Sequence, residues 1–271
     1  MSFKDNLRRI RLEKRMTQEV LAEKLDVTFQ AVSSWERGEY LPETEKLLKL
    51  TDVLDVSVSA LVNDSASSFS LRDRLFDPEH MKTFIKATAR ENGLSGTLKA
   101  LSFAEDAHEG QKRKNTDVPY IYHPLMLACH AIALGIRDDD VISACLLHDV
   151  VEDCGKEMSD LPVSDRARKL VQLLTHGDTE PSSRQEVMDA YYRDISRDPD
   201  ASLIKCLDRC HNLSTMSYGL SNSKQIRMIT ETERYYPALL DVIKNEPRYN
   251  EAAWLLNYQI NSMLDIYKRM I

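Results

Sequence analysis

The segment CLLHDVVEDC, over residues 145–154, places four ionisable side chains among apolar ones. In a continuous helix, with about 100° per residue, these four groups fall within an arc of roughly 140°, and leucine and valine cover the rest. They are His148, Asp149, Glu152 and Asp153. Burying them without a partner is costly, whereas a divalent cation neutralises carboxylates and accepts imidazole as a neutral donor. The pattern therefore predicts a metal site on one side of this helix.

Two further candidate ligands lie elsewhere in the chain. His123 stands just before an apolar run that begins at Pro124, and Asp208 lies inside the apolar-lined segment LIKCLDRCHNL. With His148 and Asp149 they make a set of two imidazoles and two carboxylates. Such a set leaves positions open for water and a phosphate oxygen, and it suits Mn²⁺, Fe²⁺, Co²⁺ or Zn²⁺. An ion held there lowers the pKa of water and polarises phosphorus.

The order His … His-Asp … Asp is the signature of the HD metal-dependent phosphohydrolases. Over residues 97–213 the chain resembles the hydrolase domain of RelA/SpoT proteins and the small alarmone hydrolases. The matching segments are FAEDAHEGQKRKNTDVPYIYHPL, GIRDDDVISACLLHDVVEDC and IKCLDRCHNL. The resemblance implies an all-helical HD fold and one bound Mn²⁺, and it makes His123, His148, Asp149 and Asp208 the metal ligands. It also implies hydrolysis of the 3′-pyrophosphate of (p)ppGpp to GDP or GTP plus pyrophosphate.

The same resemblance assigns roles to five more residues. Glu152 and Asp153 match the acidic pair that prepares the attacking water. Arg113, Lys114 and Asn212 match positions that contact the nucleotide. Asn212 follows Asp208 by one helical turn, so its side chain is expected to point into the same cavity.

The sequence departs from the family in two places. Residues 115–118 read Asn-Thr-Asp-Val where the family often has a glycine, so no base or ribose contact is assigned to this loop. No second long domain follows the hydrolase segment, so we expect no (p)ppGpp synthesis.

Two other functions are compatible with these residues. One is a transcriptional regulator whose HD pocket senses a nucleotide with little turnover. The other is an HD phosphatase that acts on a different nucleotide, such as a dNTP or NADPH. The pair Glu152-Asp153 favours an enzyme over a sensor, because a sensor does not need acidic groups that activate water.

Helical spacing of apolar residues runs through the whole chain, and strict period-2 alternation never persists, so the predicted fold class is all-α. Helix starts are marked by Thr17, Pro78, Ser95 and Asp138. The Ser-rich segment SASSFS separates two parts of different character. We therefore predict a helix-turn-helix domain of about five helices at 1–64, a linker at 65–77 and an HD domain at 78–271.

The N-terminal segment TQEVLAEKLDVTFQAVSSWER, over residues 17–37, has the pattern of a helix-turn-helix. Thr17 can cap one short helix and Thr28 a second, whose N-terminal residues would enter the major groove of DNA. Residues 3–62 resemble the Xre/Cro-type helix-turn-helix family. The alternative is a helical interaction module that binds no DNA.

The resemblance implies which residues contact DNA. The expected contacts are Gln18 to phosphate and an exposed DNA-facing edge formed by Thr28, Phe29, Gln30, Ser33 and Ser34. Gln30 could read an adenine and Phe29 could pack on a thymine methyl. A basic cluster with Arg8, Arg9 and Arg11 is expected to face phosphates. The expected partner is a double-stranded DNA operator, bound by a homodimer at half-sites about one helical turn apart.

Composition sets the cellular context that we expect. The net charge is −7, and the N-terminus is charged and lacks the apolar core of a signal peptide. Five cysteines, an odd number, suit free thiols in a reducing compartment, so a cytoplasmic protein is expected. The uncharged stretch 118–136 is interrupted by proline and histidine, so it is expected to be a buried helix without a membrane span. The five other histidines are assigned no role: His80, His108, His130, His176 and His211.

Overall fold

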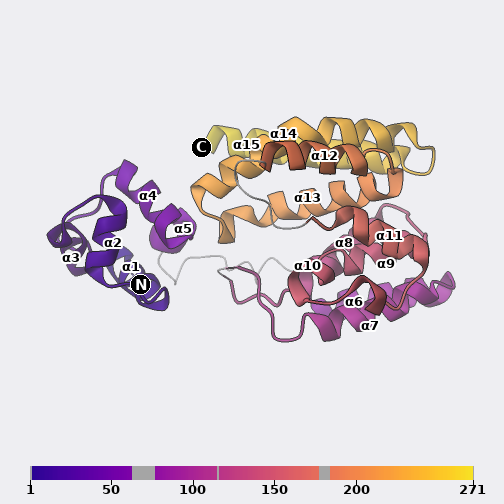
Figure 1. Ribbon diagram of the computed structural model, residues 1–271, viewed down its shortest axis with the longest axis horizontal. Coiled ribbons are helices and arrows are strands. Elements are labelled where there is room, and N and C mark those ends of the chain that lie inside the picture. The colour runs from indigo at the N-terminus through magenta and orange to yellow at the C-terminus, as the bar shows by residue number, and fades with distance from the viewer. Residues whose placement is uncertain (1, 63–76, 115, 177–183, 271) are drawn as a thin grey trace. The chain divides into compact units, whose positions relative to one another are not determined.

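A computed structural model describes residues 2–62, 77–114, 116–176 and 184–270, and every regular element in these ranges is a helix (Figure 1). The predicted all-α class is therefore confirmed. An isolated antiparallel bridge joins Lys112 and Pro119. The contacts divide the chain into two compact units. The first holds residues 1–75, 113–117 and 215–229, and the second holds residues 76–112, 118–214 and 230–271.

The first unit begins with the five helices that the sequence predicts. They are α1 (Phe3–Glu13), α2 (Gln18–Leu25), α3 (Phe29–Arg37), α4 (Thr44–Leu54) and α5 (Val58–Val62). Thr17 Oγ1 accepts a hydrogen bond from the amide of Val20 at 3.3 Å, and Thr28 Oγ1 accepts one from the amide of Ala31 at 3.2 Å. Both predicted N-caps are thus present. In each, the threonine hydroxyl accepts a hydrogen bond from a backbone amide that has no carbonyl partner within the helix.

These helices pack around a small hydrophobic core. Its central side chains are fully or almost fully buried: Leu7, Leu21, Leu25, Val32, Trp35 and Leu50. Gly38 ends α3 with φ of +76°, and a Cβ there would lie 2.9 Å from Lys4 Cδ. Glycine is therefore favoured at this position by its backbone conformation and by its packing.

The chain continues with a second set of helices. They are α6 (Pro78–Glu91), α7 (Ser95–Ala107), α8 (Tyr122–Ala133), α9 (Asp139–Leu147), α10 (Val150–Cys154), the 3₁₀ helix η2 (Met158–Asp160), α11 (Asp165–Leu174), α12 (Arg184–Ile195), α13 (Pro199–Gly219), α14 (Asn222–Asn245) and α15 (Asn250–Met270). Helix α9 packs against α7, α8 and α11 and is buried from Val141 to Leu147 (Figure 1). A helix that is apolar on all sides suits this central position.

The segment 145–154 does not form the single helix that its sequence suggests. Helix α9 starts after Asp138, as expected, but ends at Leu147, and α10 starts only at Val150. The carbonyl oxygen of Cys145 accepts a hydrogen bond from His148 Nδ1 at 2.9 Å. In a continuous helix that oxygen would bond the amide four residues on, that of Asp149. The side chain of His148 therefore competes with the backbone at the point where the helix breaks.

Other expectations concern the linker, the membrane and the cysteines. The predicted linker at 65–77 lies outside the described residues apart from Asp77, which caps α6, and the domain boundaries stay predictions. Among the described helices, none is both long enough and apolar enough to cross a membrane. All five cysteines are free, as predicted.

Candidate metal centre

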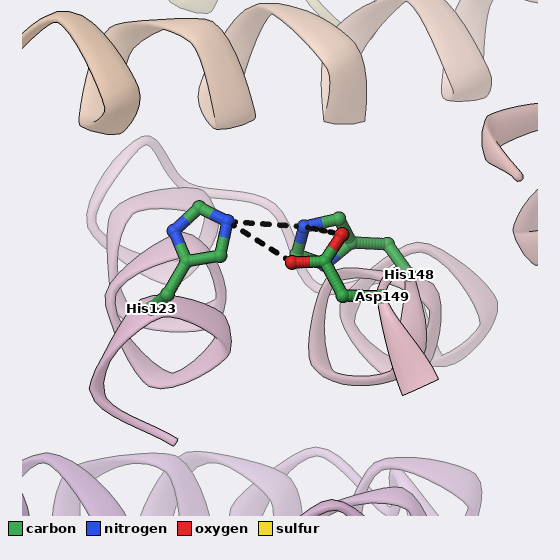
Figure 2. A group of neighbouring side chains, drawn as sticks. All are labelled: His123, His148 and Asp149. Carbon is green, nitrogen blue, oxygen red and sulfur yellow. Dashed lines mark hydrogen bonds and ion pairs between the residues drawn. The ribbon is translucent and has the colours of Figure 1, made fainter. Parts of the chain in front are cut away.

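Four side chains from three parts of the second unit lie near one another: the donor atoms of His123, His148 and Asp149 form one cluster, and Asp208 approaches it from the side of the two histidines. His123 Nε2 lies 3.2 Å from His148 Nε2, 3.4 Å from Asp149 Oδ2 and 3.2 Å from Asp208 Oδ1. His148 Nε2 lies 3.0 Å from Asp149 Oδ1. Figure 2 shows His123 facing His148 and Asp149 across the gap between two helices. Donor atoms about 3 Å apart fit around an ion whose bonds to nitrogen and oxygen are about 2.0–2.2 Å long.

The electrostatics of this cluster favour a positive charge at its centre. Burial alone would lower the pKa of His148, but the carboxylates of Asp149 and Asp208 raise it to about 9. Burial alone would raise the pKa of Asp149, but His148 and His123 hold it well below its ordinary value. Burial acts in the same way on Asp208, whose pKa is lowered by Lys205 and His123. The donor set and its charge therefore fit a divalent cation.

Both histidines are oriented by a second hydrogen bond. The bond from His148 Nδ1 to the Cys145 carbonyl requires the proton on Nδ1, which leaves the Nε2 lone pair for a metal. His123 Nδ1 lies 2.6 Å from Nδ1 of the buried His211, with the rings stacked at 4.8 Å. Partners of this kind fix the tautomer and the ring orientation of a metal-binding histidine.

Both carboxylates are held in the same way. The hydroxyl of Tyr120 donates to Asp149 Oδ2 at 2.8 Å. Lys205 Nζ lies 3.2 Å from Asp208 Oδ2, and Asn212 Nδ2 donates to Asp208 Oδ1 at 2.5 Å. All four candidate ligands thus have a second contact, which holds their donor atoms in place.

Sequence reasoning missed three of these supporting residues, namely Tyr120, Lys205 and His211. Lys205 and His211 stand three residues before and after Asp208, so helical spacing could have pointed to them. Tyr120 lies outside the regular helices, and no periodicity signals its contact with Asp149.

The predicted acidic pair, Glu152 and Asp153, lies on α10 and follows His148 and Asp149 in the chain. Glu152 accepts a hydrogen bond from the backbone amide of His176, and partial burial raises the pKa of its carboxyl group. Asp153 is exposed, and its carbonyl accepts a hydrogen bond from Gln111 Nε2 at 3.2 Å. A raised pKa makes a carboxylate a stronger base. The catalytic role of the pair stays a prediction.

The three predicted nucleotide contacts are divided between the units. Asn212 lies at the metal centre, bonded to Asp208. Arg113 and Lys114 group with the first unit, where Arg113 Nη2 donates to Thr215 Oγ1 at 3.4 Å and Lys114 pairs with Asp55. Their contact with a nucleotide stays a prediction.

The helix-turn-helix unit exposes part of the expected DNA-facing edge. Thr28, Phe29 and Gln30 are exposed at the start of α3, and Ser33 is half-buried. Gln18, the expected phosphate contact, donates to Glu36 Oε2 at 2.7 Å.

Two positions in this unit differ from the expectation. Ser34 is buried, and its Oγ accepts a hydrogen bond from Arg37 at 3.0 Å, so it does not lie on the exposed edge. Arg11 is also buried and forms two hydrogen bonds with Glu36, at 2.6 and 2.9 Å. Its guanidinium is therefore committed to the protein rather than turned toward phosphates.

Comparison with known proteins agrees with both units. The helix-turn-helix family matches residues 7–61, and the HD domain family matches residues 100–239. The chain belongs to the HD domain family, whose members depend on a metal, and it carries a helix-turn-helix domain at its N-terminus.

Several relatives are of the RelA/SpoT type. The chain is 36% identical over 146 residues to a GTP pyrophosphokinase of Streptomyces coelicolor, covering 52% of this chain and 17% of that protein. It is 28% identical over 172 residues to the bifunctional (p)ppGpp synthase/hydrolase SpoT of Escherichia coli, covering 59% and 24%. It is 34% identical over 148 residues to a guanosine-3′,5′-bis(diphosphate) 3′-pyrophosphohydrolase of Aquifex aeolicus, covering 52% and 20%. The chain thus spans less than a quarter of the length of these relatives.

A solved structure confirms the fold. It comes from work described as "A metazoan ortholog of SpoT hydrolyzes ppGpp and plays a role in starvation responses". The similarity has a TM-score of 0.51 at 21% identity and covers 64% of this chain and 96% of that one.

Proposed function

We propose that this protein is a metal-dependent hydrolase that removes the 3′-pyrophosphate of (p)ppGpp, giving GDP or GTP and pyrophosphate. The observation that carries the proposal is the cluster of His123, His148, Asp149 and Asp208, with each ligand held by a second contact. The choice of substrate is supported by the relative from Aquifex aeolicus, which is named as a 3′-pyrophosphohydrolase.

The four ligands would hold one divalent cation, which we propose to be Mn²⁺, with Fe²⁺, Co²⁺ or Zn²⁺ as substitutes. When bound, the cation supplies a Lewis acid and lowers the pKa of water. In the proposed reaction a water oxygen bonds to the phosphorus nearest the ribose, and the bond from that phosphorus to the 3′ oxygen breaks. The 3′ oxygen leaves as a hydroxyl after gaining a proton.

Side chains of the protein carry the other roles in the proposed reaction. Glu152 and Asp153 take the proton of the attacking water, a task suited to the raised pKa of Glu152. Arg113 and Lys114 offset the charge of the pyrophosphate. Asn212 holds Asp208 in place while contacting the nucleotide.

Incubation of the purified chain with Mn²⁺ and a panel of nucleotides tests the proposal. The panel contains ppGpp, pppGpp, a dNTP and NADPH, and the readouts are released pyrophosphate and phosphate. Pyrophosphate release from ppGpp and pppGpp, with no reaction of the dNTP or NADPH, is the expected result. Phosphate release from the dNTP or NADPH, without reaction of ppGpp, would instead make the protein an HD phosphatase of another specificity.

A second candidate function is a nucleotide sensor that controls transcription, and the helix-turn-helix domain favours it. The double substitution Glu152→Gln/Asp153→Asn separates the two. For the enzyme we expect turnover to fall by about 10²–10⁴-fold, because a general acid or base is lost, with metal content and ppGpp affinity retained. Tight binding of ppGpp by the metal-loaded wild type without any release would favour the sensor.

We also propose that residues 1–64 bind a double-stranded DNA operator as part of a homodimer. Exposed Gln30 faces bases in this proposal, whereas Arg8 and Arg9 face phosphates. Gln30→Ala should weaken the preference for the operator while leaving nonspecific binding largely unchanged. Selection from random oligonucleotides measures the preference, and a wild-type chain that selects no sequence would contradict specific binding.

A further inference from the structure

The C-terminal end of α4 carries a carboxylate that holds two lysines. Asp55 Oδ2 pairs with Lys114, and Asp55 Oδ1 accepts a hydrogen bond from Lys224 Nζ at 2.7 Å. Burial alone would raise the pKa of Asp55, but the two lysines hold it below its ordinary value. All three side chains belong to the first unit, in which they join the helix-turn-helix domain to residues 113–117 and 215–229.

A second set of contacts fixes the backbone at Lys114. Arg113 Nη2 donates to Thr215 Oγ1 at 3.4 Å, and a Cβ at Gly219 would lie 2.5 Å from the carbonyl oxygen of Lys114. Glycine therefore permits this close approach, which any larger residue would prevent. Thr215 and Gly219 follow the candidate ligand Asp208 by seven and eleven residues, so all three lie on one face of α13. The main chain of Lys114 thus packs on the helix that carries a candidate metal ligand.

The three charged side chains of this cluster can exchange one partner without losing the other. Two ammonium groups share one carboxylate, so the cluster has a net positive charge. Each lysine contacts a different oxygen of Asp55, so Lys224 keeps its contact when Lys114 leaves. Half of the Lys114 side chain is exposed, and exposed ion pairs are weak. A phosphate group, which presents oxygens with more negative charge than a carboxylate, can therefore displace Asp55 from Lys114.

We propose that Asp55 and a phosphate group of the nucleotide compete for Lys114, so that nucleotide binding releases this lysine from the helix-turn-helix domain. The inference rests on the proposed function, in which Lys114 offsets the charge of the nucleotide. Without nucleotide, Asp55 occupies Lys114 and lowers the affinity for nucleotide. With nucleotide, Asp55 keeps Lys224 and the domain loses its ion pair with Lys114. Because such coupling is reciprocal, any event that draws Asp55 away from Lys114 strengthens nucleotide binding by the same factor.

The affinity for ppGpp in Asp55→Asn tests the competition. It is measured by calorimetry on the full chain with Mn²⁺, in the Glu152→Gln/Asp153→Asn background so that turnover does not interfere. Asparagine suits the position, because Asp55 has φ of +50° and asparagine tolerates this conformation. We expect the affinity to rise by about twofold to fivefold, the range of an exposed ion pair. An unchanged affinity would overturn the proposal, and a lower one would show instead that Asp55 positions Lys114 for the nucleotide.

Two further variants control for indirect effects. Asp52 also lies near the end of α4, but it accepts its hydrogen bonds from the backbone and hydroxyl of Ser223. Asp52→Asn should therefore leave the ppGpp affinity unchanged, and a gain equal to that of Asp55→Asn would attribute the effect to a general loosening of α4. In a Lys114→Met background, Asp55→Asn should have no effect, because the contested group is gone. A gain that persists there would overturn the competition.

Carbodiimide cross-linking observes the ion pair directly. The reagent joins a carboxylate and a lysine amine in contact as an amide, and mass spectrometry of the tryptic peptides identifies the pair. We expect Asp55 to be linked to Lys114 and to Lys224 without nucleotide, and ppGpp should reduce the first link while the second persists. The pair of Glu233 and Lys268 in the second unit is the internal control, whose link should not change. Absence of the Asp55–Lys114 link, or a link that ppGpp does not reduce, would overturn the proposal.

These measurements separate the competition from the proposed hydrolysis. Pyrophosphate release together with an unchanged affinity in Asp55→Asn would reject the competition and keep the hydrolase. Binding of ppGpp without release would reject the hydrolase, and a gain in Asp55→Asn would still support the competition. A wild type that binds no ppGpp would overturn both.

Discussion

Two of the regions in which the protein buries charged side chains differ in how those charges are balanced. In the helix-turn-helix unit, Glu36 receives two hydrogen bonds from Arg11 and one from Gln18. In the metal centre, Asp149 and Asp208 face two imidazoles, and Lys205 contacts Asp208 from one side. The first group is balanced by the protein itself, whereas the second stabilises a cation at its centre. A buried charge therefore indicates a binding site where protein groups do not fully neutralise it and a bound ligand can do so.

The largest expected effect comes from removing a ligand of the metal centre. Asp149→Ala should reduce the metal content from about one ion per chain to near zero, because it removes one of the two negatively charged donors. Elemental analysis of the purified protein measures this. Arg11→Met, which removes a buried charge from the other region, should leave the metal content unchanged. A metal content that survives Asp149→Ala would reject the assigned ligand set.

Disruption of the buried Arg11–Glu36 pair should lower the stability of the helix-turn-helix unit without affecting the metal content. Arg11→Met should lower the free energy of unfolding of that unit by about 3 kcal/mol, because it leaves the Glu36 carboxylate buried without its main partner. Arg11→Met/Glu36→Leu should recover most of the loss, since no unpaired charge remains. Urea denaturation followed by Trp35 fluorescence in a Trp254→Phe background measures both. Equal losses in the single and double variants would contradict a role for the unpaired charge.

A smaller effect is expected from the contacts that orient the ligands. Tyr120→Phe should weaken metal affinity by about 10–100-fold, because it removes the hydrogen bond to Asp149. Tyr249→Phe is a matched control, because it removes a similar bond, from a buried tyrosine to Asp200 at 2.6 Å, away from the metal centre. Calorimetric titration with Mn²⁺ compares the two. Equal weakening in both variants would point to a general loss of stability.

The smallest effect is a dependence of stability on pH in the metal-free protein. The pKa of His148 is raised from 6.5 to about 9, so its protonation stabilises the fold fully below pH 6.5. That contribution is lost as the pH rises through about 9. The melting temperature in EDTA should therefore fall by several degrees over this range, and bound metal should flatten the profile because the ion replaces the proton. A profile that is the same with and without metal would contradict the coupling.

The sequence predicted those features that depend on local spacing or on a recurring motif. The caps Thr17 and Thr28 follow from the preference of helix starts for such residues, and both are confirmed. The convergence of His123, His148, Asp149 and Asp208 followed from the order of these residues in a known family, and the structure brings them together.

The sequence could not predict features that depend on partners far away in the chain. Arg11 is buried and bonds Glu36, which lies 25 residues away in the chain. Helix periodicity predicts one continuous helix over 145–154. It takes no account of the bond from the His148 side chain to the Cys145 carbonyl, which replaces a backbone bond.

The break between α9 and α10 has a geometric consequence for chelation. Adjacent residues of an unbroken helix point about 100° apart, which turns neighbouring side chains away from a common target. At the break, His148 Nε2 and Asp149 Oδ1 approach to 3.0 Å, so the donor atoms of two consecutive residues lie side by side. An imidazole nitrogen and a carboxylate oxygen from two consecutive residues are thus available to the same ion.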